Sequence, residues 1–316
     1  MITKDLFLQS LEQYIIPCIA KGRPSPDTLE AYMKHIRIFF KWCQKNNRHP
    51  LKMTEQQIRL YYQELVDKGY KPLTIHIKIS ALKALYRAAI AQGLIFDNPC
   101  TNIQTQGGNP PTLRYYLDMN QLQVVCNAYS DEPDDFIRNR NTLILYLFSV
   151  EGLRPVDIFR LNMQDINWQS YTIDFRTADN REAYEAQQIY PCQETINVLM
   201  DYINSIPGDI IDKLMGQLAP LIISNSKNNF AGRLSRNGMR LIINNALDKA
   251  GLKVSGSSAN LLRNSCGTNL FKATNDIKLV QKTLRQQSLI SAMKYMEDNP
   301  TLSKRATNII APKRNE

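Results

Sequence analysis

The chain has 316 residues, 43% of them hydrophobic, and its 39 Lys and Arg against 29 Asp and Glu give a net charge of +10. This length excludes one ordinary domain and suits two, while the absence of any apolar run of roughly 18–20 residues excludes a membrane span. The positive charge suits a polyanionic partner such as nucleic acid, although an ordinary basic soluble protein fits the charge equally well.

The first hundred residues predict a compact bundle of helices, because their apolar residues recur at helical spacing. The expected helices cover about 5–20, 26–46, 54–68 and 73–92. Ser25 is the expected N-cap of the second helix, with Pro26 at its first position, and Thr54 is the capping residue of the third. Gly93 ends the fourth helix.

A stretch rich in Gly and Pro, 103–112, separates two predicted domains. The chain is therefore divided into a helical domain at 1–104, a linker at 105–112 and a second domain at 113–316. Residues 1–105 hold 15 Lys and Arg against 8 Asp and Glu, whereas the other 211 residues hold 24 against 21. The first domain is expected to attract a polyanion more strongly than the second.

The second domain predicts helices around one small sheet. Helices are expected at about 118–129, 135–151, 193–206, 236–250, 258–272, 276–285 and 288–296. Two strands, 171–175 and 187–190, are expected to pair across a turn at 177–186, and a short tail occupies 297–316. The fold class is therefore mainly α with a small antiparallel sheet.

The strongest local motif is Glu151-Gly-Leu-Arg154-Pro-Val-Asp157. Arg154 is placed at the start of a helix, where the free backbone amides and the guanidinium together form an anion site. Asp157, three residues later, is placed to orient that guanidinium. Taken singly, Arg154 fits an ordinary surface arginine near a helix start better than an anion site.

Two further motifs follow in the chain, Asn260-Leu-Leu-Arg263 and the segment from Leu284-Arg-Gln-Gln to Tyr295. Each is weak by itself, but their order and spacing after Arg154 resemble the tyrosine recombinase (phage integrase) family. The resemblance extends over about 5–296. In the first domain it includes the segments 25–32 and 74–86 and the closing turn Asn98-Pro99.

The resemblance implies a helical, SAM-like core-binding domain and an α+β catalytic domain that form a C-shaped clamp on double-stranded DNA. Tyr295 would attack a DNA phosphate and form a 3′-phosphotyrosyl bond, which conserves the bond energy, so that no metal, ATP or other cofactor is needed. Arg154 and Arg263 would stabilise the phosphorane. The family also implies a homotetramer at a specific DNA repeat.

Several positions depart from the family pattern. The histidine of the family's H-x-x-R motif is Asn260 here, the next histidine is Asn264, and the His or Trp position is Gln286. The lysine expected in the β-hairpin is absent, and that segment offers only Arg176 or Arg181. Asn and Gln do not exchange protons near neutral pH, and Arg is a poor general acid.

Three interpretations follow. The first is an active but divergent recombinase that uses Tyr295. The second is a DNA-binding protein of the same fold, impaired in catalysis, that acts as an accessory or regulatory factor. The third is an unrelated helical protein, in which Tyr295 is an ordinary residue of an amphipathic helix.

Six basic residues are candidate contacts to DNA phosphates, which position a protein without specifying sequence. They are Lys78, Lys83 and Arg87 in the first domain, and Arg233, Arg236 and Arg240 in the second. The spacing of the last three predicts one helical face. A solvated basic face explains either set equally well.

The cysteines indicate neither a zinc site nor a disulfide scaffold, because no two are close in sequence. They are Cys18, Cys43, Cys100, Cys126, Cys192 and Cys266. They are interpreted as reduced residues, with Cys266 as a small packing residue. The N-terminus shows no signal peptide, so a cytoplasmic, nucleoid-associated protein is expected.

Overall fold

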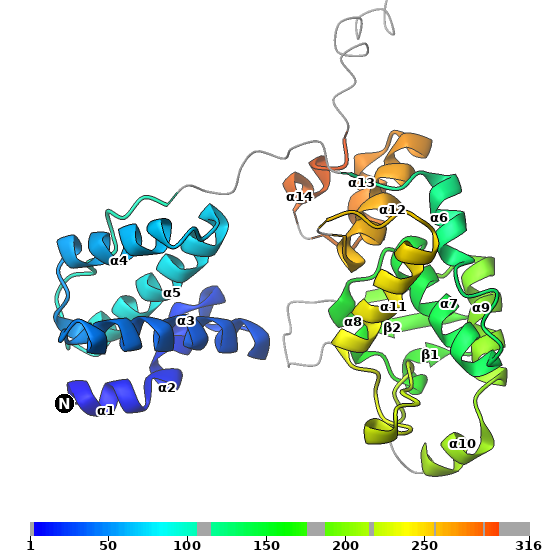
Figure 1. The fold of residues 1–316 in the computed structure, drawn as a ribbon, viewed down its shortest axis with the longest axis horizontal. Coiled ribbons are helices and arrows are strands. Elements are labelled where there is room, and N and C mark those ends of the chain that lie inside the picture. The colour runs from blue at the N-terminus through cyan, green and yellow to red at the C-terminus, as the bar shows by residue number, and fades with distance from the viewer. Residues whose placement is uncertain are drawn as a thin grey trace, which may run out of the picture. The chain divides into compact units, whose positions relative to one another are not determined.

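The computed structural model describes residues 3–105, 115–175, 187–214, 218–255, 257–286 and 288–296. The chain divides into two compact units, residues 1–112 and 113–316. Helices dominate both units, and the second contains one small sheet (Figure 1). The predicted fold class, mainly α with a small antiparallel sheet, is confirmed.

The first unit is a helical bundle with a single apolar core. Its helices are α1 (Lys4–Gln9), α2 (Leu11–Ile15), α3 (Pro26–Lys45), α4 (Glu55–Asp67) and α5 (Pro72–Ala91). The segment predicted as one helix at 5–20 is instead two short helices followed by 3-10 turns. Ser10 has φ −107° and ψ 23°, which interrupts the helix, and Pro17 lies in the first 3-10 turn because it cannot donate a helical hydrogen bond.

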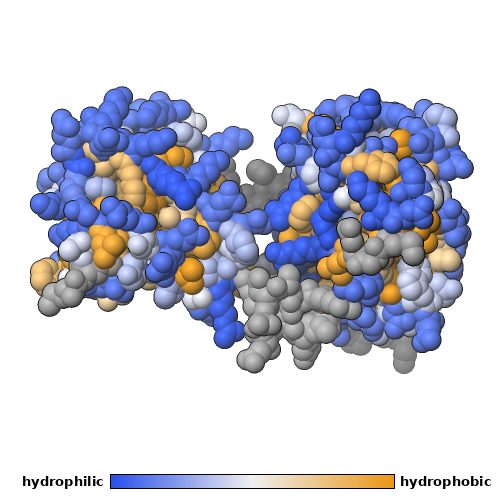
Figure 2. Space-filling view, turned by 90° about the horizontal axis from the view of Figure 1, so that it is seen from below, coloured by the Kyte–Doolittle hydropathy of each residue, from blue (hydrophilic) through white to orange (hydrophobic). Residues whose placement is uncertain are grey.

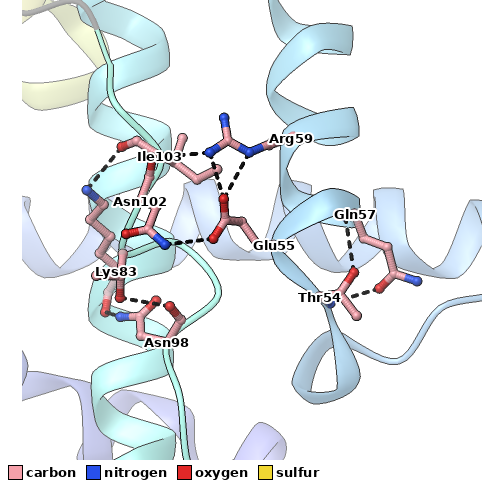
Figure 3. Close-up of polar contacts among 9 residues, drawn as sticks. Thr54, Glu55, Gln57, Arg59, Lys83, Asn98, Asn102 and Ile103 are labelled. Carbon is pink, nitrogen blue, oxygen red and sulfur yellow. Dashed lines mark hydrogen bonds and ion pairs between the residues drawn. The ribbon is translucent and has the colours of Figure 1, made fainter.

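The predicted helix starts of the first unit are confirmed in detail. Ser25 accepts a hydrogen bond from the Thr28 N–H at 3.2 Å, with Pro26 at the first helical position. Thr54 and Gln57 form a capping box, in which each side chain accepts from the other residue's backbone N–H (Figure 3). These bonds satisfy amides that the first helical turn leaves unpaired.

The second unit surrounds the buried helix α7. Its helices are α6 (Met119–Cys126), α7 (Asp135–Ser149), α8 (Pro155–Arg160), α9 (Gln193–Asn204), α10 (Gly208–Leu214), α11 (Arg236–Lys249), α12 (Ala259–Thr274), α13 (Ile277–Thr283) and α14 (Leu289–Met293). Helix α7 packs against α9 and α12, and its Leu143, Ile144 and Phe148 are fully buried. The packing of α12 on this core positions the residues of the candidate site. Helix α10 was not predicted from the sequence.

The sheet has three antiparallel strands in the order β1 (Ile166–Asn167), β2 (Thr172–Phe175) and β3 (Gln187–Ile189). Ile173 pairs with Ile166 on one side and with Ile189 on the other. Strands β2 and β3 are the predicted pair, whereas the two-residue strand β1 was not predicted. The turn predicted at 177–186 lies outside the described residues.

On the face shown in Figure 2, the described residues of both units are mostly hydrophilic, with apolar patches between polar side chains. Among the described helices, none combines the length and the apolar character that crossing a bilayer requires.

We expect Thr54→Ala to lower the free energy of unfolding of the first unit by about 1 kcal/mol, because it removes the side-chain cap of α4. Urea denaturation, followed by circular dichroism, measures this change. The matched control is Gln56→Ala, which truncates an exposed side chain in the same helical turn. An equal loss in both variants would contradict a specific contribution of the cap.

Candidate active site

The turn Leu284–Gln286, between α13 and α14, brings the sequence-predicted residues together. The carbonyl of Leu284 accepts from Arg263 Nη2 at 2.5 Å, and the carbonyl of Arg285 accepts from Arg154 Nη2 at 2.7 Å. Gln286 Nε2 lies 3.2 Å from the Tyr295 hydroxyl oxygen. One short turn therefore contacts both predicted arginines and the predicted nucleophile.

Arg263 is a buried residue of α12, with 5% of its surface exposed. Besides Leu284, its guanidinium donates from Nη1 to the carbonyl of Gly152. Gly152 has φ +60°, and a Cβ at this position would collide with Leu284, so both the conformation and the space favour glycine. Burial, reinforced by the nearby charges of Arg154 and Arg285, lowers the pKa of Arg263 to about 10. Arg263 is thus still cationic near neutral pH.

Arg154 is the N-cap residue of α8, as the sequence predicted, and is half-buried. The predicted orientation of its guanidinium by Asp157 is wrong. Asp157 Oδ2 instead accepts from the Arg154 backbone N–H at 3.0 Å and from Arg285 Nη2 at 2.8 Å. The Arg154 guanidinium is held by the Arg285 carbonyl, because the capping geometry of α8 directs Asp157 to the backbone.

Arg285 is a site residue that sequence reasoning missed. Its side chain is 6% exposed and stacks over the ring of Phe175, with Cζ 4.4 Å from the ring centroid. Burial and the neighbouring Arg154 lower its pKa, and the ion pair with Asp157 opposes that shift. The sequence contains one sign that could have identified Arg285 as a site residue: it is an arginine at the position where the family motif has a glycine.

Tyr295 is buried, with 2% of its surface exposed, and its ring packs among Cys266, Val280 and Leu284. Its hydroxyl donates to Asn264 Oδ1 at 3.2 Å and accepts from Gln286 Nε2 at 3.2 Å. The packing of Cys266 is as predicted. The hydroxyl is therefore oriented by two side-chain amides.

Among the described residues, Asn260 is a predicted site residue that is not part of this cluster. Asn260 is exposed at the start of α12, and it is Asn264, one helical turn later, that reaches Tyr295. The sequence identifies Asn264 as a substituted histidine but does not predict it as a site residue. Arg176 and Arg181 lie outside the described residues.

All three candidate DNA contacts in the first unit make contacts within that unit. Lys78 is 3% exposed and lies over the Tyr70 ring, with Nζ 4.8 Å from the centroid, so its prediction as a surface contact is wrong. Lys83 donates to the Ile103 carbonyl at 3.2 Å (Figure 3). Arg87 is exposed and donates to the Cys18 carbonyl at 2.8 Å. The apolar environment of α5 explains these internal partners.

In the second unit the three predicted arginines do not share one helical face. Arg233 precedes α11 and donates to the carbonyls of Phe159 and Leu161 at 2.6 and 2.8 Å. Burial lowers its pKa. Arg236 and Arg240 are exposed on α11, four residues apart. Arg233 therefore joins loops within the unit, whereas Arg236, although exposed, lies over the Phe159 ring, with Cζ 4.9 Å from the centroid.

Family models match both parts of the chain. The model described as "Phage integrase family" matches residues 116–301, and "Phage integrase, N-terminal SAM-like domain" matches residues 19–94. The tyrosine recombinase XerC of Lactobacillus delbrueckii subsp. bulgaricus is 23% identical over 291 residues, covering 90% of this chain and 93% of the relative. The XerC of Halalkalibacterium halodurans is 25% identical over 289 residues, 86% of each protein.

Solved structures share the fold. XerH site-specific recombinase bound to palindromic difH substrate has a TM-score of 0.69 at 20% identity, covering 90% of this chain and 80% of that one. The Tn1549 transposon integrase in complex with circular intermediate DNA has a TM-score of 0.68 at 16% identity, with 94% and 98% covered. A lambda integrase tetramer bound to a Holliday junction has a TM-score of 0.62 at 19% identity, with 92% and 77% covered.

We expect Arg233→Ala to destabilise the second unit by on the order of 2 kcal/mol, because it removes charge-assisted hydrogen bonds to the part-buried carbonyls of Phe159 and Leu161. Arg240→Ala, which truncates an exposed arginine, should change stability by less than about 0.5 kcal/mol. Urea unfolding of both variants measures the difference. Equal stabilities would contradict the internal role of Arg233.

Proposed function

Because this chain belongs to the phage integrase family, we propose that it is a site-specific DNA recombinase that cleaves and rejoins DNA through Tyr295. The resemblance seen in the sequence motifs is thereby confirmed, and an unrelated helical protein is excluded. The observation that carries the proposed activity is the convergence of Arg154, Arg263 and the Tyr295 hydroxyl on the turn Leu284–Gln286.

The proposed reaction is attack of the Tyr295 hydroxyl oxygen on a DNA backbone phosphorus. The new bond joins that oxygen to phosphorus, and the bond to the 5′ oxygen breaks, which leaves a 3′-phosphotyrosyl link and a free 5′-hydroxyl. Arg154 and Arg263 stabilise the negative charge of the intermediate, and loss of one such donor typically costs on the order of 10²–10³ in rate. Attack by the 5′-hydroxyl of a second strand reverses the chemistry and rejoins the DNA.

The two amides at the hydroxyl orient it without moving its proton. Asn264 accepts the phenolic hydrogen, and Gln286 donates to the oxygen, but neither group titrates near neutral pH. Water therefore takes the phenolic proton and supplies one to the 5′ oxygen. General acid–base help is worth roughly 10²–10⁴-fold, so this enzyme should be slow rather than inactive.

The proposed partner is double-stranded DNA at a specific repeat, bound by a homotetramer. This assembly is supported by the lambda integrase tetramer on a Holliday junction, which shares the fold. Arg236 and Arg240 on α11 and Arg87 on α5 are the exposed basic candidates for phosphate contacts. The protein would act in the compartment that holds the DNA, which for this family is the cytoplasm with its nucleoid.

We expect wild-type protein to form a denaturant-resistant adduct with a nicked suicide duplex, and Tyr295→Phe to form none while binding the same duplex. The duplex is one enriched from a random-sequence library by the protein itself. Gel electrophoresis after denaturation measures the adduct, and fluorescence anisotropy measures binding.

Binding by wild type without any adduct would instead favour the second interpretation, a DNA-binding protein with impaired catalysis. Restoring histidine with Asn260→His and Gln286→His distinguishes a slow enzyme from an inactive one. An adduct that persists in Tyr295→Phe would show that another residue is the nucleophile.

We expect Gly267→Ala to reduce adduct formation with little change in stability. A Cβ on Gly267 would lie 2.7 Å from Leu284 Cδ1, which must shift, and 3.0 Å from Tyr295 Cε1, so the tyrosine ring must move by a few tenths of an ångström. The better helix propensity of alanine, worth about 1 kcal/mol, offsets the crowding. Thermal unfolding and the adduct assay separate the two effects. Gly208→Ala is the control, because no atom lies within 4 Å of its added Cβ.

A further inference from the structure

Arg285 and Arg154 are joined by a closed set of hydrogen bonds. Arg154 donates from Nη2 to the Arg285 carbonyl at 2.7 Å. In the opposite direction, Arg285 Nη2 donates to Asp157 Oδ2 at 2.8 Å, and the same oxygen accepts the Arg154 backbone N–H at 3.0 Å. The backbone and the guanidinium of Arg154 are thus both tied to Arg285.

The backbone at Arg285 is in a conformation that favours glycine, with φ +48°. Strained conformations of this kind cluster at functional sites, where the surrounding structure holds them. The side chain is nevertheless ordered, since it pairs with Asp157 and stacks on Phe175. Glycine would adopt this backbone conformation without strain, so an arginine at this position indicates a role for the arginine side chain.

The charges around Arg285 also indicate an anion-binding site. Burial and the charges of Arg154 and Arg285 lower the pKa of Arg263, and burial and the charge of Arg154 lower that of Arg285. Asp157 is the carboxylate in hydrogen-bond contact with this group within the described residues. The Arg285 Nη1 atom is buried and has no hydrogen-bond partner among the described residues. Such an excess of buried positive charge favours binding of an anion such as a phosphate.

We propose that Arg285 is a positioning residue, which fixes Arg154 toward the DNA phosphate through Asp157. The inference rests on the proposed recombinase activity. Loss of the Arg285 side chain leaves two bonds in place, from Arg154 Nη2 to the carbonyl of residue 285 and from the Arg154 backbone N–H to Asp157. It removes the ion pair that ties Asp157 to residue 285, so Arg154 keeps only one of its two connections to that residue.

The test is a double-mutant cycle with the suicide duplex. Arg285→Gly should slow adduct formation roughly 10-fold to 100-fold, as expected for a misplaced catalytic group. Arg154→Ala should be slowed on the order of 10²–10³-fold. The double variant should be no slower than Arg154→Ala, because Arg285 acts through Arg154.

Stability measurements separate positioning from folding. Arg285→Gly should melt within about 4 °C of wild type, because glycine suits the positive φ. Arg285→Asn, which also tolerates this conformation, is the second variant and should match its rate. Arg138→Ala is the control, since it removes an arginine ion-paired to Asp135 in the same unit, and should keep the wild-type rate.

Two kinetic results would overturn the proposal. One is a wild-type rate in Arg285→Gly, and the other is a double variant that is slower than Arg154→Ala by the full factor measured for Arg285→Gly.

If wild type forms no adduct, the proposed activity fails, and the role of Arg285 is measured by DNA binding. In this experiment, each duplex has one phosphate replaced by a neutral methylphosphonate, and the replacement is moved along the duplex position by position. Wild-type protein should bind more weakly when the replaced phosphate is the one that Arg154 contacts. At that phosphate, the methylphosphonate should weaken binding by Arg285→Gly less than it weakens binding by wild type, as is also expected for Arg154→Ala. A loss of affinity in Arg285→Gly as large as that in wild type would refute the positioning role.

Discussion

Two consecutive peptide carbonyls, those of Leu284 and Arg285, accept hydrogen bonds from the guanidiniums of Arg263 and Arg154. The arginines come from helices α12 and α8, which are more than a hundred residues apart in the chain. Because Gln286 of the same turn contacts Tyr295, a shift of this turn would move both phosphate-binding groups and the nucleophile together. The geometry of the site therefore depends on the packing that fixes the turn.

That packing depends on two glycines that lie close to the side chain of Leu284. Gly152 and Gly267 leave room for Leu284, whose side chain is fully buried between them, and Gly267 also borders the Tyr295 ring. Helix α12 rests in turn on the buried helix α7. The apolar core thus holds cationic groups in a partly desolvated environment, where their interaction with a phosphate is stronger than in water.

The chemistry of the site is dominated by charge and orientation. Side-chain amides occupy the positions next to the Tyr295 hydroxyl, and the three histidines of the chain all lie in the first unit. Under the proposed mechanism, catalysis then relies on Arg154 and Arg263, with Arg285 as a second attachment for Arg154. Electrostatic stabilisation of this kind is usually the largest single contribution to such reactions.

The sequence by itself determined the family, the helical class, most helix bounds and the positions of Arg154, Arg263 and Tyr295, because these follow from local periodicity, capping residues and motif spacing. Only the tertiary structure decided which side chains meet. Asp157 pairs with Arg285, and Lys78 and Arg233 are internal. Asn264 contacts the Tyr295 hydroxyl, whereas the predicted site residue Asn260 is exposed. Burial and side-chain contacts arise from segments distant in the chain, so spacing along one helix cannot predict them.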